Sequence, residues 1–324
     1  MTSGNSERST ASDHEPAGWH ASEKRRDEAR LEWPTLLVTA AIYGGWLALT
    51  AEAYRLPPAL VVLAGGWLIA WHGSLQHEVI HGHPTRWQRV NTLIGAVPLS
   101  LWLPFVIYRR SHLGHHATPA ITDPFDDPES RYLAFDRSRL GRMRHMAERM
   151  QATLLGRLLF GPAIMVGRFL AGELAGLIRD PIGRARDWLP HLAGSAMLLW
   201  WLDRCGIGFA SYALMFVYPG LSLTLLRSFA EHRAAPVPGH RVATVERAGP
   251  FALLFLYNNL HVAHHQRPGL AWYQLPDYYR QHRERLAYDN GGLVYSGYGD
   301  VVRRYLLRGH DRLVHPNHAH SDRP

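Results

Sequence analysis

Cysteine and lysine are almost missing from this 324-residue chain. Cys205 is the only cysteine, which excludes an internal disulfide, a cysteine-ligated iron–sulfur cluster and a thiolate zinc site within one chain. Any bound metal must therefore be held by nitrogen and oxygen ligands. Lys24 is the only lysine, so the formal net charge of +8 comes from arginine. Because the sequence has no zinc finger, RRM signature or basic base-reading helix, we expect no nucleic-acid partner.

Modules that bind nucleotides or carry electrons are also lacking. There is no Gly-x-Gly-x-x-Gly after a predicted strand, no flavin signature and no fused haem domain. An enzyme built on this chain would therefore receive electrons from a separate donor. Residues 1–30 are polar and charged and contain no apolar core of the kind that a secretory signal needs, so we expect a disordered cytoplasmic tail.

Long apolar segments predict an all-α, multi-pass membrane protein. Four of them are joined in pairs by very short links, which predicts about four transmembrane helices in two hairpins. These segments are residues 34–54, 56–71, 188–202 and 207–226. We expect residues 31–290 to form this membrane domain, with a cytoplasmic helical cap that holds the metal site. Residues 291–324 are expected to be a C-terminal tail.

Two further apolar stretches do not look like spans. Residues 92–108 carry two prolines, which break regular helical hydrogen bonding and favour an interfacial or re-entrant segment. Residues 154–178 are interrupted by Arg157, Arg168 and Glu173. This pattern predicts either an amphipathic helix on the membrane surface or a soluble helix packed on the cytoplasmic domain.

Basic residues predict the orientation of the hairpins. The two predicted tips carry only Arg55 and Arg204, whereas the opposite flanks are rich in arginine. Positive charge favours the cytoplasmic side, so we expect the tips to point away from it. This places the chain in the cell (inner) membrane, with its termini and metal site in the cytoplasm.

Histidines form three motifs at helical spacing, followed by one single candidate. Residues three and four apart lie on one face of a helix, so each motif can direct two or three imidazoles at one point. The motifs are His77-Glu-Val-Ile-His81, His112-Leu-Gly-His115-His116 and His261-Val-Ala-His264-His265, and the single residue is His232. The predicted topology brings all four elements to the cytoplasmic side.

Nine converging histidines predict two metals. Zinc usually takes four ligands, so this set exceeds what one zinc ion needs. Neutral imidazole suits iron, copper, nickel and zinc, so the ligand type alone does not choose the metal. The remaining histidines have no partner at ligand spacing or lie in the polar C-terminal region, where we expect them to be solvated. They include His72, His83, His145, His191, His282, His310, His315, His318 and His320.

The first motif also supports a different hypothesis. His77-Glu78-x-x-His81 matches the metalloprotease signature, in which two histidines bind zinc and the glutamate is the general base. That alternative is a membrane zinc metalloprotease, and it leaves both His-x-x-His-His motifs without a function. A metal transporter or a haem-binding membrane protein would need polar residues along a path through the membrane, and the predicted spans contain almost none.

In order and spacing, these motifs resemble those of the membrane fatty-acid desaturase and hydroxylase superfamily, over roughly residues 35–285. The resemblance implies that the eight motif histidines, with His232, bind two iron ions (Fe2+) and that O2 is the co-substrate. Some relatives have an asparagine where this chain has Ser228. Asn258 and Asn259 are then candidates for that ligand position, or for hydrogen bonding to ligand imidazoles.

A finer resemblance concerns the stretches 122–130 and 258–269. They are similar to bacterial branches that act on small non-lipid compounds, of the dihydrorhizobitoxine desaturase type. Asp123, Asp126 and Asp127 in the first stretch either orient ligand imidazoles or belong to an ordinary proline-rich acidic loop.

The reaction implied by the resemblance is the desaturation of an unactivated C–C bond in a fatty acyl chain or a related small molecule, by removal of hydrogen from its C–H bonds with dioxygen as oxidant. A hydroxylase or ketolase would share every ligand, and the sequence does not distinguish them. The implied partners are the lipid bilayer and a separate electron donor, either ferredoxin or a cytochrome with its reductase. The basic cytoplasmic face would suit an acidic donor.

Overall fold

The computed structural model describes residues 31–318, and its regular structure is almost entirely helical. The predicted N-terminal tail and His320 lie outside these residues. The longer helices are α1 (Trp33–Glu52), α2 (Pro58–Ile80), α6 (Leu154–Arg179), α7 (Pro181–Arg204) and α9 (Tyr218–Glu231). The shorter ones are α3 (Gln88–Gly95), α4 (Phe105–Ala117), α5 (Arg139–Met150), α8 (Phe209–Tyr212), α10 (Pro250–Leu254), α11 (His261–Gln266), α12 (Leu275–Asp289) and α13 (Tyr298–Tyr305). Two short strands, β1 (Thr244–Val245) and β2 (Val294–Tyr295), pair in parallel.

Four helical stretches within the described residues are long and apolar enough to cross a membrane, which confirms the predicted multi-pass, all-α class. They are Trp33–Arg55, Pro58–Ile80, Leu154–Arg179 and Phe209–Glu231. The last combines α8, a π-helical turn at Ala213–Val217, and α9.

The third of these stretches is not the one that the sequence predicted. The segment 188–202 belongs to α7, which begins at Pro181 and carries Arg184, Arg186 and Asp187 in its first two turns. Residues 154–178, expected on the membrane surface or on the cytoplasmic domain, instead form the apolar helix α6. Two of its charged residues have partners outside the helix: Arg168 pairs with Glu148, and Glu173 accepts from Arg184 at 2.5 Å. Paired charges cost less in an apolar helix than the sequence alone suggests.

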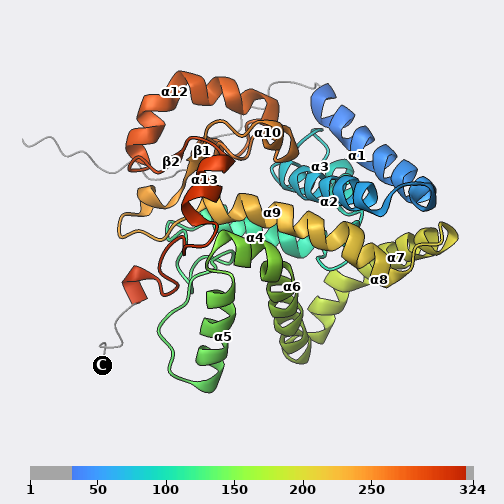
Figure 1. The fold of residues 1–324 in the computed structure, drawn as a ribbon, viewed down its shortest axis with the longest axis horizontal. Coiled ribbons are helices and arrows are strands. Elements are labelled where there is room, and N and C mark those ends of the chain that lie inside the picture. The colour runs from blue at the N-terminus through green and yellow to red at the C-terminus, as the bar shows by residue number, and fades with distance from the viewer. Residues whose placement is uncertain (1–30, 319–324) are drawn as a thin grey trace, which may run out of the picture.

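Helix α2 lies at the centre of the fold, between α1 and α9 (Figure 1). Small residues let α2 and α9 approach closely. A Cβ atom added at Gly220 would lie 2.5 Å from the Cβ of Ile69, and one added at Gly66 would lie 2.9 Å from Pro219. Glycine contacts of this kind are typical of helix packing within membranes, where backbone proximity replaces the hydrophobic driving force.

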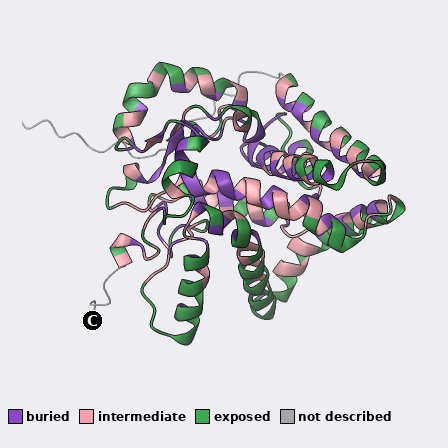
Figure 2. Ribbon diagram, viewed as in Figure 1, coloured by how far each residue is buried: buried purple, intermediate pink, exposed green. Residues whose placement is uncertain are grey.

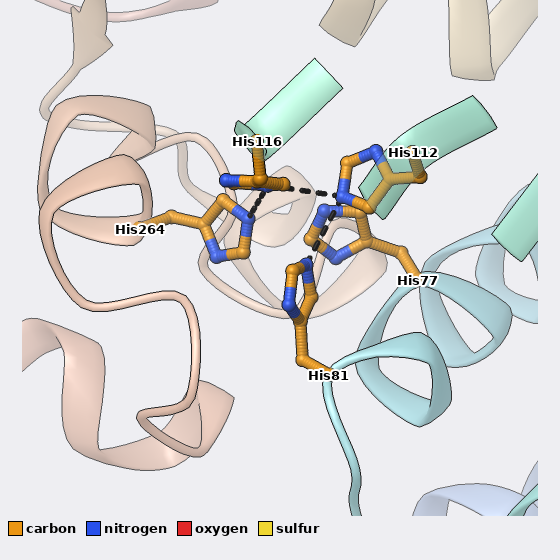
Figure 3. Close-up of side chains that lie close together, drawn as sticks. All are labelled: His77, His81, His112, His116 and His264. Carbon is orange, nitrogen blue, oxygen red and sulfur yellow. Dashed lines mark hydrogen bonds between the residues drawn. The ribbon is translucent and has the colours of Figure 1, made fainter. Parts of the chain in front are cut away.

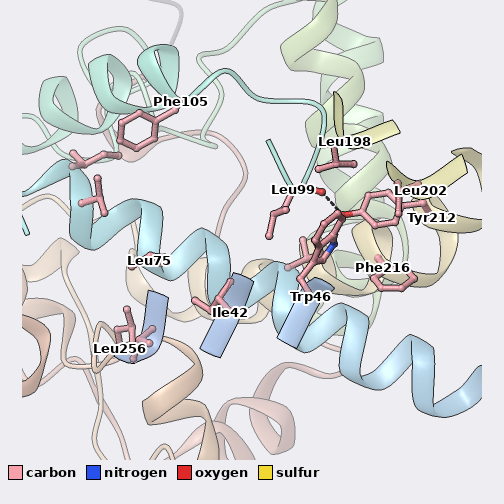
Figure 4. Packing of buried hydrophobic residues seen from close by; sticks show 14 of the residues in the cluster. Ile42, Trp46, Leu75, Leu99, Phe105, Leu198, Leu202, Tyr212, Phe216 and Leu256 are labelled. Carbon is pink, nitrogen blue, oxygen red and sulfur yellow. Dashed lines mark hydrogen bonds between the residues drawn. The ribbon is translucent and has the colours of Figure 1, made fainter. Parts of the chain in front are cut away.

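The core extends from this helix pair to α1 and α7. Ile42 and Leu202 are fully buried in it, together with the aromatic rings of Trp46 and Tyr212 (Figure 4). The indole of Trp46 donates to the Tyr212 hydroxyl at 2.9 Å, and that hydroxyl donates to the Leu99 carbonyl at 2.7 Å. Both polar aromatic tips therefore have partners inside the apolar core.

The outer faces of the long helices carry large exposed apolar side chains. Leu37 on α1, Leu63 on α2, Leu174 on α6 and Met197 on α7 are all well exposed. Figure 2 shows exposed residues along these helices and the buried ones gathered where the helices meet. Exposed apolar side chains on this scale fit a surface that contacts lipid. Together with the four long apolar helices, they indicate that the chain is a membrane protein.

The C-terminal region corrects one expectation. Residues 291–318, predicted as a tail, pack onto the helical body: β2 pairs with β1, and Val301 is fully buried. His310 and His315, expected to be solvated, are buried as well. The polar composition misled the prediction because the contacts of this region are with residues far back in the chain. Arg131, for example, pairs with Asp311 at 3.2 Å.

Candidate metal centre

The ends of two long helices and two short helices bring the nine predicted histidines together. His77 lies in the last turn of α2 and His81 directly after it, while His232 follows the end of α9. The other two motifs lie on α4 and α11. All nine side chains are buried or half-buried, although the sequence around them is polar.

The nine histidines form two groups rather than one. In each group, one ligand atom per residue lies within 4.8 Å of all the others. The first group is His77, His81, His112, His116 and His264, and the second is His115, His232, His261 and His265. Figure 3 shows the first group, with side chains from α2, α4 and α11 directed at one point.

Each His-x-x-His-His motif contributes to both groups. His112 and His116 are four residues apart and share one face of α4, and they join the first group. His115 points to the second. On α11 the assignment is reversed: His261 and His265 join the second group and His264 the first. Relative to the first histidine of the motif, the residue four positions later is rotated by about 40° to one side and the residue three positions later by about 60° to the other side. The last two histidines therefore point in directions about 100° apart. The motif is thus suited to two adjacent metal positions.

Distances between the imidazole nitrogens test whether a metal fits the first group. The Nε2 atom of His112 lies 3.0 Å from that of His81 and 3.1 Å from that of His116, and His116 Nε2 lies 3.0 Å from His264 Nε2. With metal–nitrogen bonds of about 2.0–2.1 Å, neighbouring ligands at right angles are about 2.9 Å apart. These separations match one coordination sphere.

The second group gives the same result. His261 Nε2 lies 2.9 Å from His232 Nε2 and 3.1 Å from His265 Nε2, and His115 Nε2 lies 3.3 Å from His265 Nε2. An imidazole nitrogen carries at most one proton, so these clustered nitrogens cannot all be satisfied by hydrogen bonds to one another. A cation between them would satisfy all the lone pairs at once. Both groups can hold a metal ion.

Hydrogen bonds at Nδ1 fix the orientation of several rings. Asp127 lies 2.8 Å from His115 Nδ1, and Glu129 lies 3.2 Å from His112 Nδ1. His261 Nδ1 lies 3.0 Å from Asn258 Oδ1, and His232 Nδ1 donates to the Arg241 carbonyl at 3.3 Å. These contacts leave Nε2 free of a proton and directed at the group, as metal-binding histidines require.

Burial also favours the neutral form of these rings. Burial, followed by the proximity of other imidazoles, holds the pKa of His261, His264 and His265 well below its usual range, and it lowers the pKa of His232 to about 3. His115 is the exception. Burial lowers its pKa, but the hydrogen bond that its Nδ1–H donates to Asp127 and the charge of Glu129 outweigh that effect and raise the pKa. Only a neutral imidazole can offer its lone pair to a metal.

The residues predicted to support the ligand histidines lie at different distances from the centre. Asn258 lies beside the centre as expected, 3.0 Å from His261 Nδ1, and its Nδ2 also lies 3.4 Å from His77 Nε2. Asn259 instead donates to the Val245 carbonyl. Asp123, a candidate for orienting a ligand imidazole, instead contacts His318 Nε2 at 2.7 Å, which corrects that expectation. Asp127, four residues later in the same loop, takes that position.

Two carboxylates beside the histidine groups were not predicted from the sequence. Glu129 supports His112, and Glu231 Oε1 lies 3.2 Å from Asn258 Nδ2 and 3.5 Å from His261 Nδ1. Neither belongs to a motif. The available signals were the position of Glu129 in the acidic loop after the second motif and that of Glu231 directly before His232.

The glutamate of the first motif is not placed as a general base. Glu78 Oε1 accepts the backbone N–H of Trp272 at 2.9 Å and lies 3.8 Å from His83 Nε2. It contributes to a different cluster, with Glu32 and His83. The geometry that a zinc protease needs, with the carboxylate beside the metal, is not formed by Glu78.

A search among curated proteins finds no match to this chain. A profile of the fatty acid desaturase family, however, matches residues 53–298. This range covers more than half of the chain and includes all nine histidines of the two groups. It does not favour the metalloprotease alternative. The chain therefore belongs to the fatty acid desaturase family, as a membrane protein whose histidine clusters can hold metal.

Proposed function

We propose that this desaturase-family oxidoreductase binds two iron ions and uses dioxygen to remove two hydrogens from neighbouring carbons of a fatty acyl chain or a related small molecule. The observation that carries the proposal is the convergence of nine imidazole ring nitrogens, one from each histidine, in two adjacent groups. Family membership supports an oxidoreductase of the desaturase or hydroxylase type. It does not favour a hydrolase.

The two groups would hold one iron each. His77, His81, His112, His116 and His264 would bind the first, and His115, His232, His261 and His265 the second. When bound, the irons would supply the dioxygen chemistry on unactivated C–H bonds that side chains cannot perform. Asn258 is placed to support the rings of both groups, because it contacts His77 and His261. Ser228 Oγ donates to the Leu225 carbonyl, which does not favour it as a ligand.

The protein's own residues would shape this chemistry in two ways. Asp127 and Glu129 would keep the Nδ1 protons of His115 and His112 in place, which fixes the tautomer that binds metal. Burial would keep bulk water from the centre, because His115 and His261 are at most 3% exposed.

Electrons would come from a separate ferredoxin, or from a cytochrome with its reductase. Helix α5 presents the exposed basic side chains of Arg139, Arg142 and Arg144, which would attract an acidic donor. The proposal places the chain in the cell (inner) membrane with the histidine groups on the cytoplasmic side, where these donors are found.

The test is to purify the full chain anaerobically in detergent, count metals per chain, and then supply reductant, dioxygen and candidate acyl substrates. The proposal expects two irons and a product lighter by two hydrogens, formed only with dioxygen. One zinc per chain would contradict the metal assignment. Two irons with a product heavier by one oxygen would instead identify a hydroxylase or ketolase.

A further inference from the structure

A cavity of about 560 Å3 lies beside the second histidine group. Its wall includes His115, His232 and His261, and it extends along α6 from Arg157 past Phe169. Its volume is in the range of sites that bind drug-sized ligands. A molecule in this cavity would reach the histidines.

Arg157 stands out on the wall of this cavity. Its side chain is buried, with the residue only 6% exposed, and its Nη1 donates to Gln151 Oε1 at 2.5 Å. Its Nε has no hydrogen-bond partner, and among residues 31–318 no carboxylate forms an ion pair with it. A buried guanidinium without a counter-charge is costly, so a site of this kind is expected to receive an anion.

The other arginines on the wall already have acidic partners. These pairs are Arg131 with Asp311, Arg168 with Glu148, and Arg227 with Glu231. Arg131 also has an unpartnered Nε, but its Nη2 is paired. The Nε of Arg227 lies 2.8 Å from Glu231 Oε1, although its N–H is not aligned on that oxygen. Among the arginines on the cavity wall, Arg157 is therefore the one whose charge is not neutralised by a carboxylate.

Glu148 does not neutralise Arg157 directly. It accepts from Gln151 Nε2 at 2.9 Å and pairs with Arg168, while the Gln151 oxygen faces Arg157. The amide of Gln151 thus holds the guanidinium in place without adding negative charge. This arrangement presents a fixed, unpaired cation to the cavity.

We propose that the cavity binds the substrate through a carboxylate, which pairs with Arg157, while an apolar remainder lies along the wall toward the second histidine group. This inference rests on the proposed function, because it takes the ligand of the cavity to be the substrate. One spare positive charge matches one carboxylate, which a guanidinium can bind through two parallel hydrogen bonds. The apolar part of the wall, from side chains such as Leu103, Ile107 and Leu225, suits a hydrocarbon chain.

The test measures binding rather than turnover. Isothermal titration of the full-length, detergent-solubilised protein at neutral pH would compare octanoate with octan-1-ol, which has the same chain without the charge. Acetate and inorganic phosphate serve as anions without a chain. The variants are Arg157→Gln, Arg157→Lys and the matched control Arg89→Gln, which removes the same charge from an exposed position on α3.

The wild-type protein is expected to bind octanoate at least about 10-fold more tightly than octan-1-ol, the factor typical of a buried charge-assisted hydrogen bond. Arg157→Gln should remove this preference, Arg157→Lys should keep part of it, and Arg89→Gln should behave as the wild type. Equal wild-type binding of the two probes, or full preference in Arg157→Gln, would overturn the proposal. Acetate or phosphate binding as tightly as octanoate would show that the site takes a small anion instead of the substrate.

Two further measurements keep the results separable. Gel filtration and thermal unfolding identify a variant that does not fold. If Arg157→Gln does not fold, the preference of the wild type for octanoate and the reduction of that preference in Arg157→Lys test the carboxylate proposal. Iron content and oxygen-dependent turnover are measured on the same preparations, so a failure of the desaturase assignment is seen independently of carboxylate binding.

Discussion

Replacing Asp127 by asparagine should selectively weaken the second metal position. Asp127 is buried, and its carboxylate lies 2.8 Å from His115 Nδ1. The same group accepts the backbone N–H of Thr122 at 2.8 Å and that of Glu129 at 2.9 Å. Asparagine keeps the shape but brings an NH2 group to one of these donors, so one contact is lost and the ring of His115 is held less firmly.

The magnitude follows from these contacts. Hydrogen bonds to a charged group are worth about 1.5–3 kcal/mol, which corresponds to about 10- to 150-fold in an equilibrium constant. Loss of a hydrogen-bond partner to a ligand histidine typically costs about 10- to 100-fold in metal affinity or activity. We therefore expect Asp127→Asn to bind one of its two irons at least about 10-fold more weakly, with the other little changed.

Anaerobic iron titration of the purified variants measures this effect. Asp123→Asn is the matched control, because Asp123 lies in the same loop but contacts His318 instead of a centre histidine. The reasoning would be refuted if Asp127→Asn bound two irons with wild-type affinity, or if Asp123→Asn lost iron to the same extent. Thermal unfolding of both variants separates loss of metal from loss of fold.

Three further predictions concern packing, the first motif and acid stability. Gly220→Ala should destabilise the fold by about 1–3 kcal/mol, since the new Cβ would lie 2.5 Å from Ile69; denaturant unfolding in detergent checks this against Gly44→Ala, whose Cβ would meet no atom within 4 Å. Glu78→Gln should retain both metals and lose only about 1 kcal/mol of stability, because the amide oxygen can still accept from Trp272; loss of metal or of turnover would revive a direct role for Glu78 at the centre. Burial raises the pKa of Asp311, but its contacts with Arg131 and His310 outweigh burial and lower the pKa from 3.8 to about 2. The ionised carboxylate should therefore contribute about 2 kcal/mol to the free energy of unfolding above pH 4, and this contribution should be lost as the pH falls through 2. Unfolding measured across that range should show this loss in the wild type but not in Asp311→Asn.

Spacing in the sequence was sufficient to predict eight of the nine histidines but not their grouping. The i, i+3 and i, i+4 patterns identified the eight motif histidines, because helical geometry places them on one face whatever surrounds them. His232 was predicted from its position just after the last apolar segment. Which of them share a metal position depends on how α4 and α11 face each other, and that is set by tertiary packing. His115 and His116 are neighbours in sequence but belong to different groups.

Supporting residues and helix roles were harder to predict for related reasons. Asp123 and Asp127 are chemically alike in one loop, and only the path of that loop decides which reaches His115. The charges in α6 argued against an apolar helix because their partners, such as Glu148, lie outside it. The polar C-terminal region looked unstructured because its contacts, such as that between Asp311 and Arg131, join distant parts of the chain.

Metal stoichiometry tests the central claim most directly. Elemental analysis of anaerobically reconstituted protein should give two irons per chain. His81→Ala, which alters the first group, and His232→Ala, which alters the second, should each reduce this to about one. A single metal in the wild type, or two metals retained in both variants, would contradict the assignment of two adjacent metal positions.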